Sequence, residues 1–455
     1  MNWKEIHSIY FVGIGGIGMS ALARYFLSHG KIVAGYDLTA TELTTALQKE
    51  GIEIHFEDNA DLLPNQIDLV IYTPAIPSSS ILMKALKEKG LPIFKRAQIL
   101  GELSKDKFTI AVAGSHGKTS VSAMLLHLLK SADIDCAALL GGIALNYQSN
   151  YVGGTSDILV VEADEYDRSF LQLHPDMAII TSIDTDHLDV YGSRENIVAV
   201  FKEFAERISK TGTLIQHKND VALSGFENSI SYAFSNENGA QVSNIESSKG
   251  NLVFDLHLNK IKVENCCLEA GALHNIENML AAALVAEKLG ADASQIRNGI
   301  ASYKGVKRRF ELIYQDESIT YIDDYAHHPK EIETLIKAVR KLYPEEKITV
   351  FFQPHLYSRT KDLAFDFAQS LSLADVQFLL PIYPAREKAI PGVSSALIAE
   401  YMHRKNCQMI GISEIEAALQ DCGQGVVLSV GAGDIDKQVA VIKNYFETRK
   451  PVERR

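Results

Sequence analysis

A glycine-rich loop between an apolar run and a helical pattern has the residue types that bind phosphate groups. Residues 111–120 read Ala-Val-Ala-Gly-Ser-His-Gly-Lys-Thr-Ser. Glycines allow backbone N–H groups to close around phosphate oxygens, Lys118 brings a cation to the outer phosphates, and a hydroxyl of Thr119 or Ser120 is a suitable Mg2+ ligand. The segment predicts a nucleoside-triphosphate site formed by Gly114, Ser115, His116, Gly117, Lys118, Thr119 and Ser120.

A second glycine cluster lies near the start of the chain. Residues 13–18 read Gly-Ile-Gly-Gly-Ile-Gly, follow a predicted strand and open a predicted helix. This pattern is typical of dinucleotide sites, in which the backbone approaches a diphosphate and an acid such as Asp37 accepts a hydrogen bond from a ribose hydroxyl. The same glycines also suit close packing of a helix on a sheet. Because a second phosphate loop follows, we interpret this one as a diphosphate site for a UDP-sugar in preference to NAD.

Carboxylates and a histidine follow two other hydrophobic runs. Residues 160–165 read Val-Val-Glu-Ala-Asp-Glu, and Glu162 is the first choice for a Mg2+ ligand because hard cations prefer oxygen donors. A solvated acidic turn is the alternative. Residues 185–189 read Thr-Asp-His-Leu-Asp, which makes His187 a candidate ligand for a second Mg2+, although a lone histidine is more often structural.

Three segments in the last third of the chain also carry clustered functional groups. Residues 323–329 read Asp-Asp-Tyr-Ala-His-His-Pro, without the ligand spacing of a zinc site, so they favour a loop that orients substrate or contacts a nucleotide. Residues 307–309, Lys-Arg-Arg, suit a phosphoryl clamp or a solvated basic face. Residues 353–359 read Gln-Pro-His-Leu-Tyr-Ser-Arg and again follow a predicted strand.

Composition narrows the class of protein that positions these groups. The chain has 455 residues, 46% of them hydrophobic and 22% charged, as expected for about three globular domains. The formal charge of −12 argues against nucleic acid as the main partner. Five scattered cysteines favour a reducing compartment, and the chain lacks an uninterrupted apolar run of membrane-spanning length. We therefore expect a cytoplasmic protein without a membrane partner.

Alternating apolar runs and helical patterns predict three α/β units. Strands are expected at 8–13, 32–36, 68–72 and 92–94 in the first, and at 108–113, 157–161 and 177–183 in the second. A hairpin at 252–258 and 261–267 precedes helices at 274–289 and 293–303, and the third unit has strands at 319–322, 348–352, 376–380, 408–410 and 426–430. Residues 101–107 resemble a linker, so the predicted domains are 1–104, 105–310 and 311–455.

The ordered set of motifs resembles the Mur ligases of bacterial cell-wall synthesis, especially the alanine-adding branch. The resemblance extends from Gly13 to about Asp436 and includes His-Asn-x-x-Asn at 274–278, Arg-Arg-Phe at 308–310 and Gly-Ala-Gly-Asp-Ile at 431–435. It implies an α/β fold with an N-terminal Rossmann-like domain, a central P-loop ATPase with a mixed sheet, and a C-terminal Rossmann-like domain. It also implies an enzyme of peptidoglycan precursor synthesis, in which ATP phosphorylates the carboxylate of UDP-N-acetylmuramate and the amine of L-alanine attacks the acyl phosphate.

The resemblance assigns roles to individual residues. It implies that Lys118 stabilises the transferring phosphoryl group, that Thr119 and Glu162 hold one Mg2+, and that His187 helps to hold another. Residues implied at the adenine and ribose of ATP are His274, Asn275, Asn278 and Asp324. Residues implied to position phosphate, amino acid or intermediate are Arg308, Tyr325, His327 and Arg359. The UDP-sugar is expected at Gly15, Gly16, Ile17, Gly18 and Asp37. Lys202 occupies a position at which sister ligases carry a carbamylated lysine.

Other functions stay open at this point. A related ligase that recycles murein tripeptide has the same domain plan, and the first glycine loop with Asp37 also fits a nicotinamide oxidoreductase. An ATP-driven binding module without ligation chemistry is a third possibility. The sequence leaves the oligomeric state undecided between monomer and homodimer.

Overall fold

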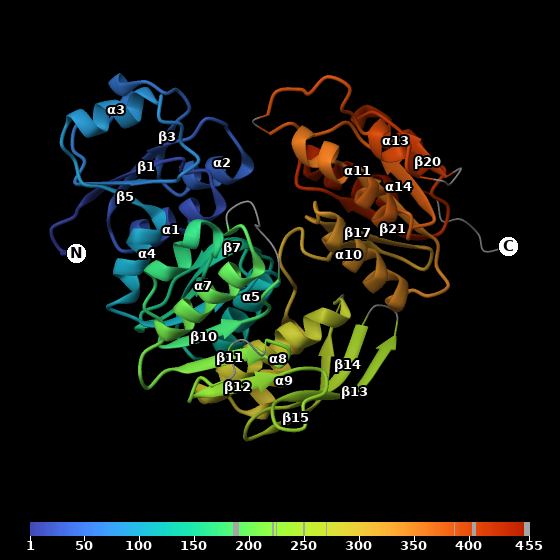
Figure 1. The fold of residues 1–455 in the computed structure, drawn as a ribbon, viewed down its shortest axis with the longest axis horizontal. Helices are drawn as coiled ribbons and strands as arrows, with labels where there is room; N and C mark the ends of the chain where they lie inside the picture. Colours follow the sequence, from blue (N-terminus) through green and yellow to red (C-terminus); the bar gives the residue numbers. More distant parts are fainter. Residues whose placement is uncertain are drawn as a thin grey trace. The chain divides into compact units, whose positions relative to one another are not determined.

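The computed structural model describes residues 1–184, 191–220, 223, 225–248, 251–269, 271–385, 387–402 and 406–449. The chain forms two compact units. Figure 1 shows their helices and strands with the labels used below. Unit 1 contains Met1–Ile245, Phe254–Cys267 and Glu277–Lys304, and unit 2 contains Glu246–Val253, Leu268–Ile276 and Gly305–Arg455.

The first sheet of unit 1 has five parallel strands in the order β3-β2-β1-β4-β5. Its elements are β1 (Ser8–Val12), α1 (Ile17–Ser28), β2 (Ile32–Tyr36), α2 (Glu42–Lys49), β3 (Glu53–His55), β4 (Leu69–Tyr72), α3 (Ile81–Glu88), β5 (Ile93–Lys95) and α4 (Arg96–Ser104). All five residues of β1 are buried, as expected for the centre of a parallel sheet covered on both faces. The four predicted strands are confirmed, and the short edge strand β3 is an addition.

The second sheet of unit 1 has seven strands in the order β12-β11-β10-β6-β9-β7-β8. Its strands are β6 (Phe108–Ala113), β7 (Ala137–Ala144), β8 (Ser149–Val152), β9 (Ile158–Glu162), β10 (Met177–Ile180), β11 (Thr213–His217) and β12 (Ser229–Tyr232). The accompanying helices are α5 (Lys118–Ser131), the 3-10 helix η2 (Tyr166–Gln172) and α7 (Arg194–Glu206). Only β8 is antiparallel to its neighbour, so the sheet is mixed, as the resemblance implied.

One hydrophobic core runs through both sheets of unit 1. Phe11 and Leu22 belong to the same buried cluster as Leu139 and Leu159. The predicted linker at 101–107 is therefore wrong over its first half, because residues 101–104 form the last turn of α4. A side chain at Gly101 would collide with the backbone of Gln172, so this turn is packed against η2.

Two further helices and a small sheet follow. The three-stranded sheet has the order β13-β14-β15, with β13 (Gln241–Ser248), β14 (Asn251–His257) and β15 (Lys262–Leu268). The predicted arms at 252–258 and 261–267 correspond to β14 and β15. The helices are α8 (Leu273–Lys288) and α9 (Ala293–Ser302), close to the predicted bounds.

The main sheet of unit 2 has six strands in the order β16-β17-β21-β18-β19-β20. Its elements are β16 (Glu311–Gln315), β17 (Ile319–Asp324), α10 (Pro329–Leu342), β18 (Ile348–Phe352), α11 (Tyr357–Leu371), β19 (Val376–Leu379), α12 (Ala396–Ala399), β20 (Cys407–Met409), α13 (Ile415–Leu419), β21 (Gly425–Val430) and α14 (Val439–Thr448). Strand β16 pairs antiparallel with β17, and the other pairs are parallel. The five predicted strands are confirmed, and β16 is an addition.

Within the described ranges, no helix combines the length and apolarity needed to cross a membrane.

Candidate functional site

The phosphate loop connects β6 to the first residue of α5. Gly114 and Gly117 have positive φ values of 134° and 82°, and a Cβ at Gly114 would collide with Thr181, so both positions require glycine. The loop is held from the opposite side, because the N–H of Ser115 donates to the Ser182 carbonyl at 2.9 Å and that of His116 donates to the Ser182 hydroxyl at 3.2 Å. Helix α5 begins directly after the loop, at Lys118, and the N–H groups of a first helical turn are the ones that bind phosphate in such sites.

Lys118 folds back over the loop that precedes it. Its Nζ donates to the Gly114 carbonyl at 2.7 Å and lies 2.8 Å from Oε2 of Glu165. Glu165 is only 3% exposed, and burial raises its pKa while the Lys118 ammonium acts in the opposite direction. The carboxylate therefore fixes Lys118 beside the predicted phosphate position.

Glu162 lies at the end of β9, next to the start of α5. The Thr119 hydroxyl donates to its Oε1 at 3.1 Å, and the N–H of Gly141 on β7 donates to its Oε2 at 3.0 Å. A hydroxyl and a carboxylate in contact are oxygen donors of the kind Mg2+ takes. Of the two hydroxyls considered from the sequence, Thr119 is the one in contact with Glu162.

The other predicted metal ligand, His187, lies outside the described residues. Within the described part of the chain, no group of three or more His, Cys, Asp or Glu side chains has the geometry of a metal site. Lys202 is exposed on α7.

Asp37 supports the first glycine loop directly. Its Oδ2 accepts a hydrogen bond from the N–H of Gly15 at 2.7 Å, and a Cβ at Gly15 would lie 2.8 Å from the same oxygen. The carboxylate thus shapes the loop, while its contact with a ribose stays a prediction.

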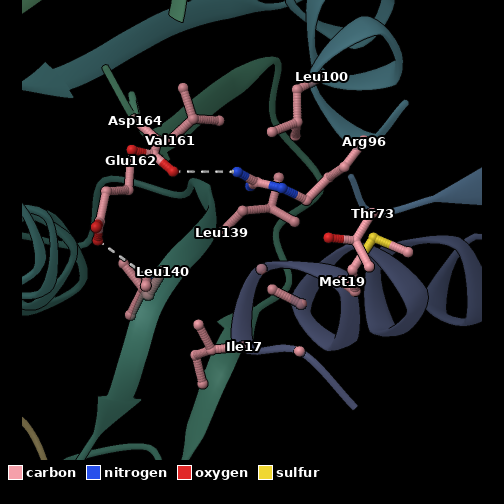
Figure 2. A pocket seen from close by; sticks show the side chains of 14 residues that line it. Ile17, Met19, Thr73, Arg96, Leu100, Leu139, Leu140, Val161, Glu162 and Asp164 are labelled. Carbon is pink, nitrogen blue, oxygen red and sulfur yellow. Dashed lines mark hydrogen bonds and ion pairs between the residues drawn. The ribbon is translucent and has the colours of Figure 1, made fainter. Parts of the chain in front are cut away.

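A cavity of about 200 Å³ joins the first glycine loop to the end of β9. Figure 2 shows Arg96 reaching across it toward Asp164, with Ile17 and Met19 of α1 on another side. The Arg96 guanidinium lies 3.9 Å from Asp164, close enough for attraction but too far for a direct hydrogen bond. The lining residues are Gly16, Ile17, Gly18, Met19, Ala21, Thr73, Arg96, Leu100, Leu139, Leu140, Gly141, Val161, Glu162 and Asp164.

The predicted nucleotide-binding residues on α8 divide between the two units. Asn278 lies beside the phosphate loop, since its Oδ1 would be 3.0 Å from a Cβ at Gly117. His274 and Asn275 lie in the first turn of the same helix, in the segment that belongs to unit 2.

In unit 2, Arg308 and the two aspartates of β17 stabilise the loop that follows the strand. Arg308 Nε donates to buried Asp323 at 2.9 Å, and its NH2 donates to the Gly431 carbonyl at 2.5 Å. Asp324 accepts backbone N–H groups of Phe310 at 2.7 Å and Ala326 at 2.8 Å, and burial raises its pKa to about 6. These contacts stabilise the loop after β17, while the catalytic role of Arg308 and the ribose contact of Asp324 stay predictions.

A second group of side chains surrounds His327. Its ring lies 5.2 Å from the Tyr325 ring and 6.0 Å from the His355 ring, measured between centroids. Burial lowers the pKa of His327, and burial with nearby His327 and Arg359 lowers the pKa of His355 to about 4. Among the described residues, His355 Nδ1 and Arg359 NH1 are buried without a hydrogen-bond partner, as expected where a polar ligand completes a site.

Three family models match successive parts of the chain. They are the Mur ligase family, catalytic domain, at residues 8–108, the Mur ligase middle domain at 112–286, and the Mur ligase, glutamate ligase domain, at 308–433. The UDP-N-acetylmuramate--L-alanine ligase of Flavobacterium psychrophilum is 44% identical over 453 residues, which cover 99% of this chain and 100% of that protein.

The chain belongs to the Mur ligase family.

Solved structures of Mur ligases extend the comparison. A UDP-N-acetylmuramate-alanine ligase of Thermotoga maritima is 29% identical, covers 97% of this chain and all of its own, and has a TM-score of 0.84. A murein peptide ligase of Psychrobacter arcticus covers 98% of this chain and all of its own, with 22% identity and a TM-score of 0.70, which shows a shared fold. The predicted three-domain α/β fold is confirmed, while its exact boundaries at 104 and 310 stay predictions.

For this Mur ligase, the structure adds site residues that the sequence alone did not single out. Arg96 follows β5 and lines the cavity at the first glycine loop. Its position just after the predicted strand at 92–94 could have indicated a site residue. His355 was part of a noted motif but was not assigned a role. Gly141 carries no side-chain chemistry and was undetectable by residue type.

Proposed function

We propose that this chain is an ATP-dependent ligase that joins L-alanine to the carboxylate of UDP-N-acetylmuramate, in the cytoplasmic synthesis of peptidoglycan precursors. The full-length similarity to proteins named for this reaction supports the substrates. The single structural observation that carries the proposal is the cavity of Figure 2, whose lining includes both Gly16 and Gly18 of the first glycine loop and Glu162 at the end of β9.

The groups that line this cavity suit a substrate that carries both a diphosphate and a carboxylate. In the proposed arrangement, Gly15, Gly16, Ile17 and Gly18 hold the diphosphate through their backbone, and Arg96 supplies the positive charge that the loop itself lacks. The sugar and its carboxylate then extend toward Glu162. NAD has a diphosphate as well, but hydride transfer gives no role to Lys118 or Glu162.

The phosphoryl-transfer step needs charge neutralisation and alignment. A carboxylate oxygen of the sugar attacks the γ-phosphorus, the bond to the β-phosphate oxygen breaks, and ADP leaves. Lys118 neutralises the transferring group from the position in which Glu165 holds it. The residues assigned to the adenine side of ATP are Asn278, which lies beside Gly117, and His274 and Asn275 of the same helix. Asp324 is assigned to the ribose.

Thr119 and Glu162 are the residues that would hold Mg2+, and their mutual contact at 3.1 Å fits the oxygen-donor set this ion takes. When bound, Mg2+ supplies positive charge to the β- and γ-phosphate oxygens. His187 stays assigned to a second ion on the resemblance alone.

The second step forms the amide bond. The amine of L-alanine attacks the acyl carbon, a C–N bond forms, inorganic phosphate leaves and the amine loses a proton. Arg308, Tyr325, His327 and Arg359 are assigned to positioning the amino acid and the leaving phosphate. The Nδ1 of His327 lies 3.1 Å from the Tyr325 carbonyl, so the neutral ring that burial favours donates there and keeps Nε2 as an acceptor.

An ADP-release assay tests the proposal. The purified protein is given ATP and Mg2+ with or without UDP-N-acetylmuramate, and L-Ala, L-Ser, Gly and murein tripeptide are compared. We expect release only when both UDP-N-acetylmuramate and an amino acid are present, with L-Ala preferred. Preference for the tripeptide would favour the recycling ligase, and tight NAD binding without ATP turnover would favour an oxidoreductase.

A further inference from the structure

A buried amide connects the second sheet of unit 1 to the start of α1. Asn150 on β8 is fully buried, and its Nδ2 donates to the Ile17 carbonyl at 2.6 Å and to the Ser20 hydroxyl at 2.8 Å. Ile17 is the first residue of α1 and lies within the first glycine loop, between Gly16 and Gly18. A side chain of the second sheet is therefore hydrogen-bonded to the helix end that is proposed to bind the diphosphate.

The other side of the same amide is held by an arginine of α1. Arg24 NH1 donates to Asn150 Oδ1. The rest of the guanidinium binds Glu50 through Nε at 2.8 Å and NH2 at 2.6 Å. Arg24 is 7% exposed, so it needs such partners: Glu50 supplies the opposite charge and Asn150 a neutral hydrogen-bond acceptor. Both ends of the Asn150 amide are thus satisfied, which fixes its orientation.

The hairpin that carries Asn150 also orients the proposed metal ligand. Leu139 of β7 pairs with Tyr151 of β8, and two residues further along β7 the N–H of Gly141 donates to Glu162 at 3.0 Å. Tyr151 adds a second contact with α1, because its hydroxyl lies 2.6 Å from that of Ser28. The β7–β8 hairpin therefore contacts both the start of α1 and the carboxylate of Glu162.

We propose that Asn150 and Arg24 are positioning residues, which set the distance between the diphosphate loop and the phosphoryl-transfer site. The proposal rests on the proposed function, since it assumes that one substrate occupies both ends of the cavity. Loss of the link lets the carboxylate of the UDP-sugar take up more positions relative to the ATP γ-phosphate. Misplacement of a reacting group by about 1 Å lowers the rate on the order of 100-fold. We therefore expect loss of the link to lower kcat more than it changes KM.

The test compares Asn150→Ala with a matched variant of the same hairpin. Asn146 also makes two hydrogen bonds, donating to the Ser302 carbonyl at 2.8 Å and accepting from the N–H of Lys304 at 2.8 Å, but it does not bridge to α1 through either bond. Arg24→Lys keeps a positive charge for Glu50 but removes the separate guanidinium nitrogen that donates to Asn150. If Asn150→Ala does not fold, Arg24→Lys is used to test the link in its place.

Turnover is measured by ADP release at saturating substrates and divided by the number of sites that bind ATP in calorimetry. We expect Asn150→Ala and Arg24→Lys each to lower kcat by about 10- to 100-fold, with the KM for ATP changed less than 2-fold. The double variant is expected to be no worse than the poorer single variant, because both changes break one link. Asn146→Ala is expected to keep at least half of the wild-type kcat.

Wild-type kcat in both Asn150→Ala and Arg24→Lys would overturn the proposal, as would an equal loss in Asn146→Ala. Absence of ADP release by the wild-type protein would instead contradict the proposed function. In that case amide hydrogen exchange at residues 17–21 still tests the link: faster exchange in Asn150→Ala than in Asn146→Ala supports it, and equal exchange overturns it.

Discussion

Lys118 and Glu165 form an ion pair in which Nζ lies 2.8 Å from Oε2, and the carboxylate is 3% exposed. The pair joins the first residue of α5 to the residue that follows the end of β9 by three positions. A buried carboxylate that keeps its charge needs such a partner, because an uncompensated charge away from water is costly. Glu165 is therefore the residue that places the lysine of the phosphate loop before any phosphate binds.

Replacing Lys118 by alanine tests its role in phosphoryl transfer. We expect kcat to fall by about 100- to 1,000-fold, the usual effect of removing one charged group that stabilises a transition state. Lys130→Ala is the control, because Lys130 lies on the same helix and pairs with Asp135 at 2.8 Å. Full ligase turnover by Lys118→Ala, measured as ADP release, would refute the mechanism.

Replacing Glu162 by glutamine tests the proposed Mg2+ site. The change keeps the size of the side chain and removes its charge, so we expect the half-saturating Mg2+ concentration to rise by about 10-fold or more. Binding of Mn2+ to the ATP-loaded protein, followed by electron paramagnetic resonance, provides a readout independent of turnover. The control is Asp157→Asn, since Asp157 directly precedes β9 and pairs with Lys107 at 3.0 Å. Equal Mn2+ affinity in wild type and Glu162→Gln would exclude the assignment.

Arg96→Gln tests whether the guanidinium binds the UDP-sugar. A hydrogen bond to a charged group contributes about 1.5–3 kcal/mol, so the KM for UDP-N-acetylmuramate is expected to rise by about 10- to 100-fold while that for ATP stays unchanged. Lys95→Gln is matched in charge and adjacent in sequence, but Lys95 pairs with Asp167 at 3.1 Å. A similar rise in both variants would indicate a general loss of positive charge and contradict a specific role for Arg96.

The titration of His355 is expected to be displaced downward. Burial and the nearby His327 and Arg359 lower its pKa to about 4, from 6.5. The folded state binds this proton less well than the unfolded state does. The neutral His355 ring therefore contributes fully to the free energy of unfolding above pH 6.5, and this contribution is lost as the pH falls toward 4. Relative to His355→Gln, the wild-type free energy of unfolding should drop by about 2–3 kcal/mol over this interval.

Ring 15N shifts of His355 across a pH titration measure this directly. A midpoint near 4 agrees with the structure, and a midpoint near 6.5 contradicts it. Urea unfolding of wild type and His355→Gln at both ends of the interval then measures the predicted change in stability.

Local patterns predicted most of the fold because periodicity and turn residues are encoded over a few neighbouring positions. The strands around β1 and β6 and the helices α8 and α9 were found within a few residues of their bounds. The short edge strands β3 and β16 were missed, since their few residues carry too little alternation. The strands β7 and β8 of the second sheet were not predicted either. The end of α4 was misread as a linker because its polar last turn packs on η2, a long-range contact.

The sequence by itself determined that this protein is a Mur ligase, through two glycine-rich loops, a strand-end Glu162 and an ordered set of His, Asp and Arg motifs. Glycines, a lysine and carboxylates at fixed spacing have few other uses together, so their types were sufficient. Only the tertiary structure decided the partners, such as Glu165 for Lys118, Gly141 for Glu162 and Asn150 for α1. Those contacts join residues far apart in the chain through a buried ion pair, a backbone group and a buried amide, whose partners depend on how strands and helices pack.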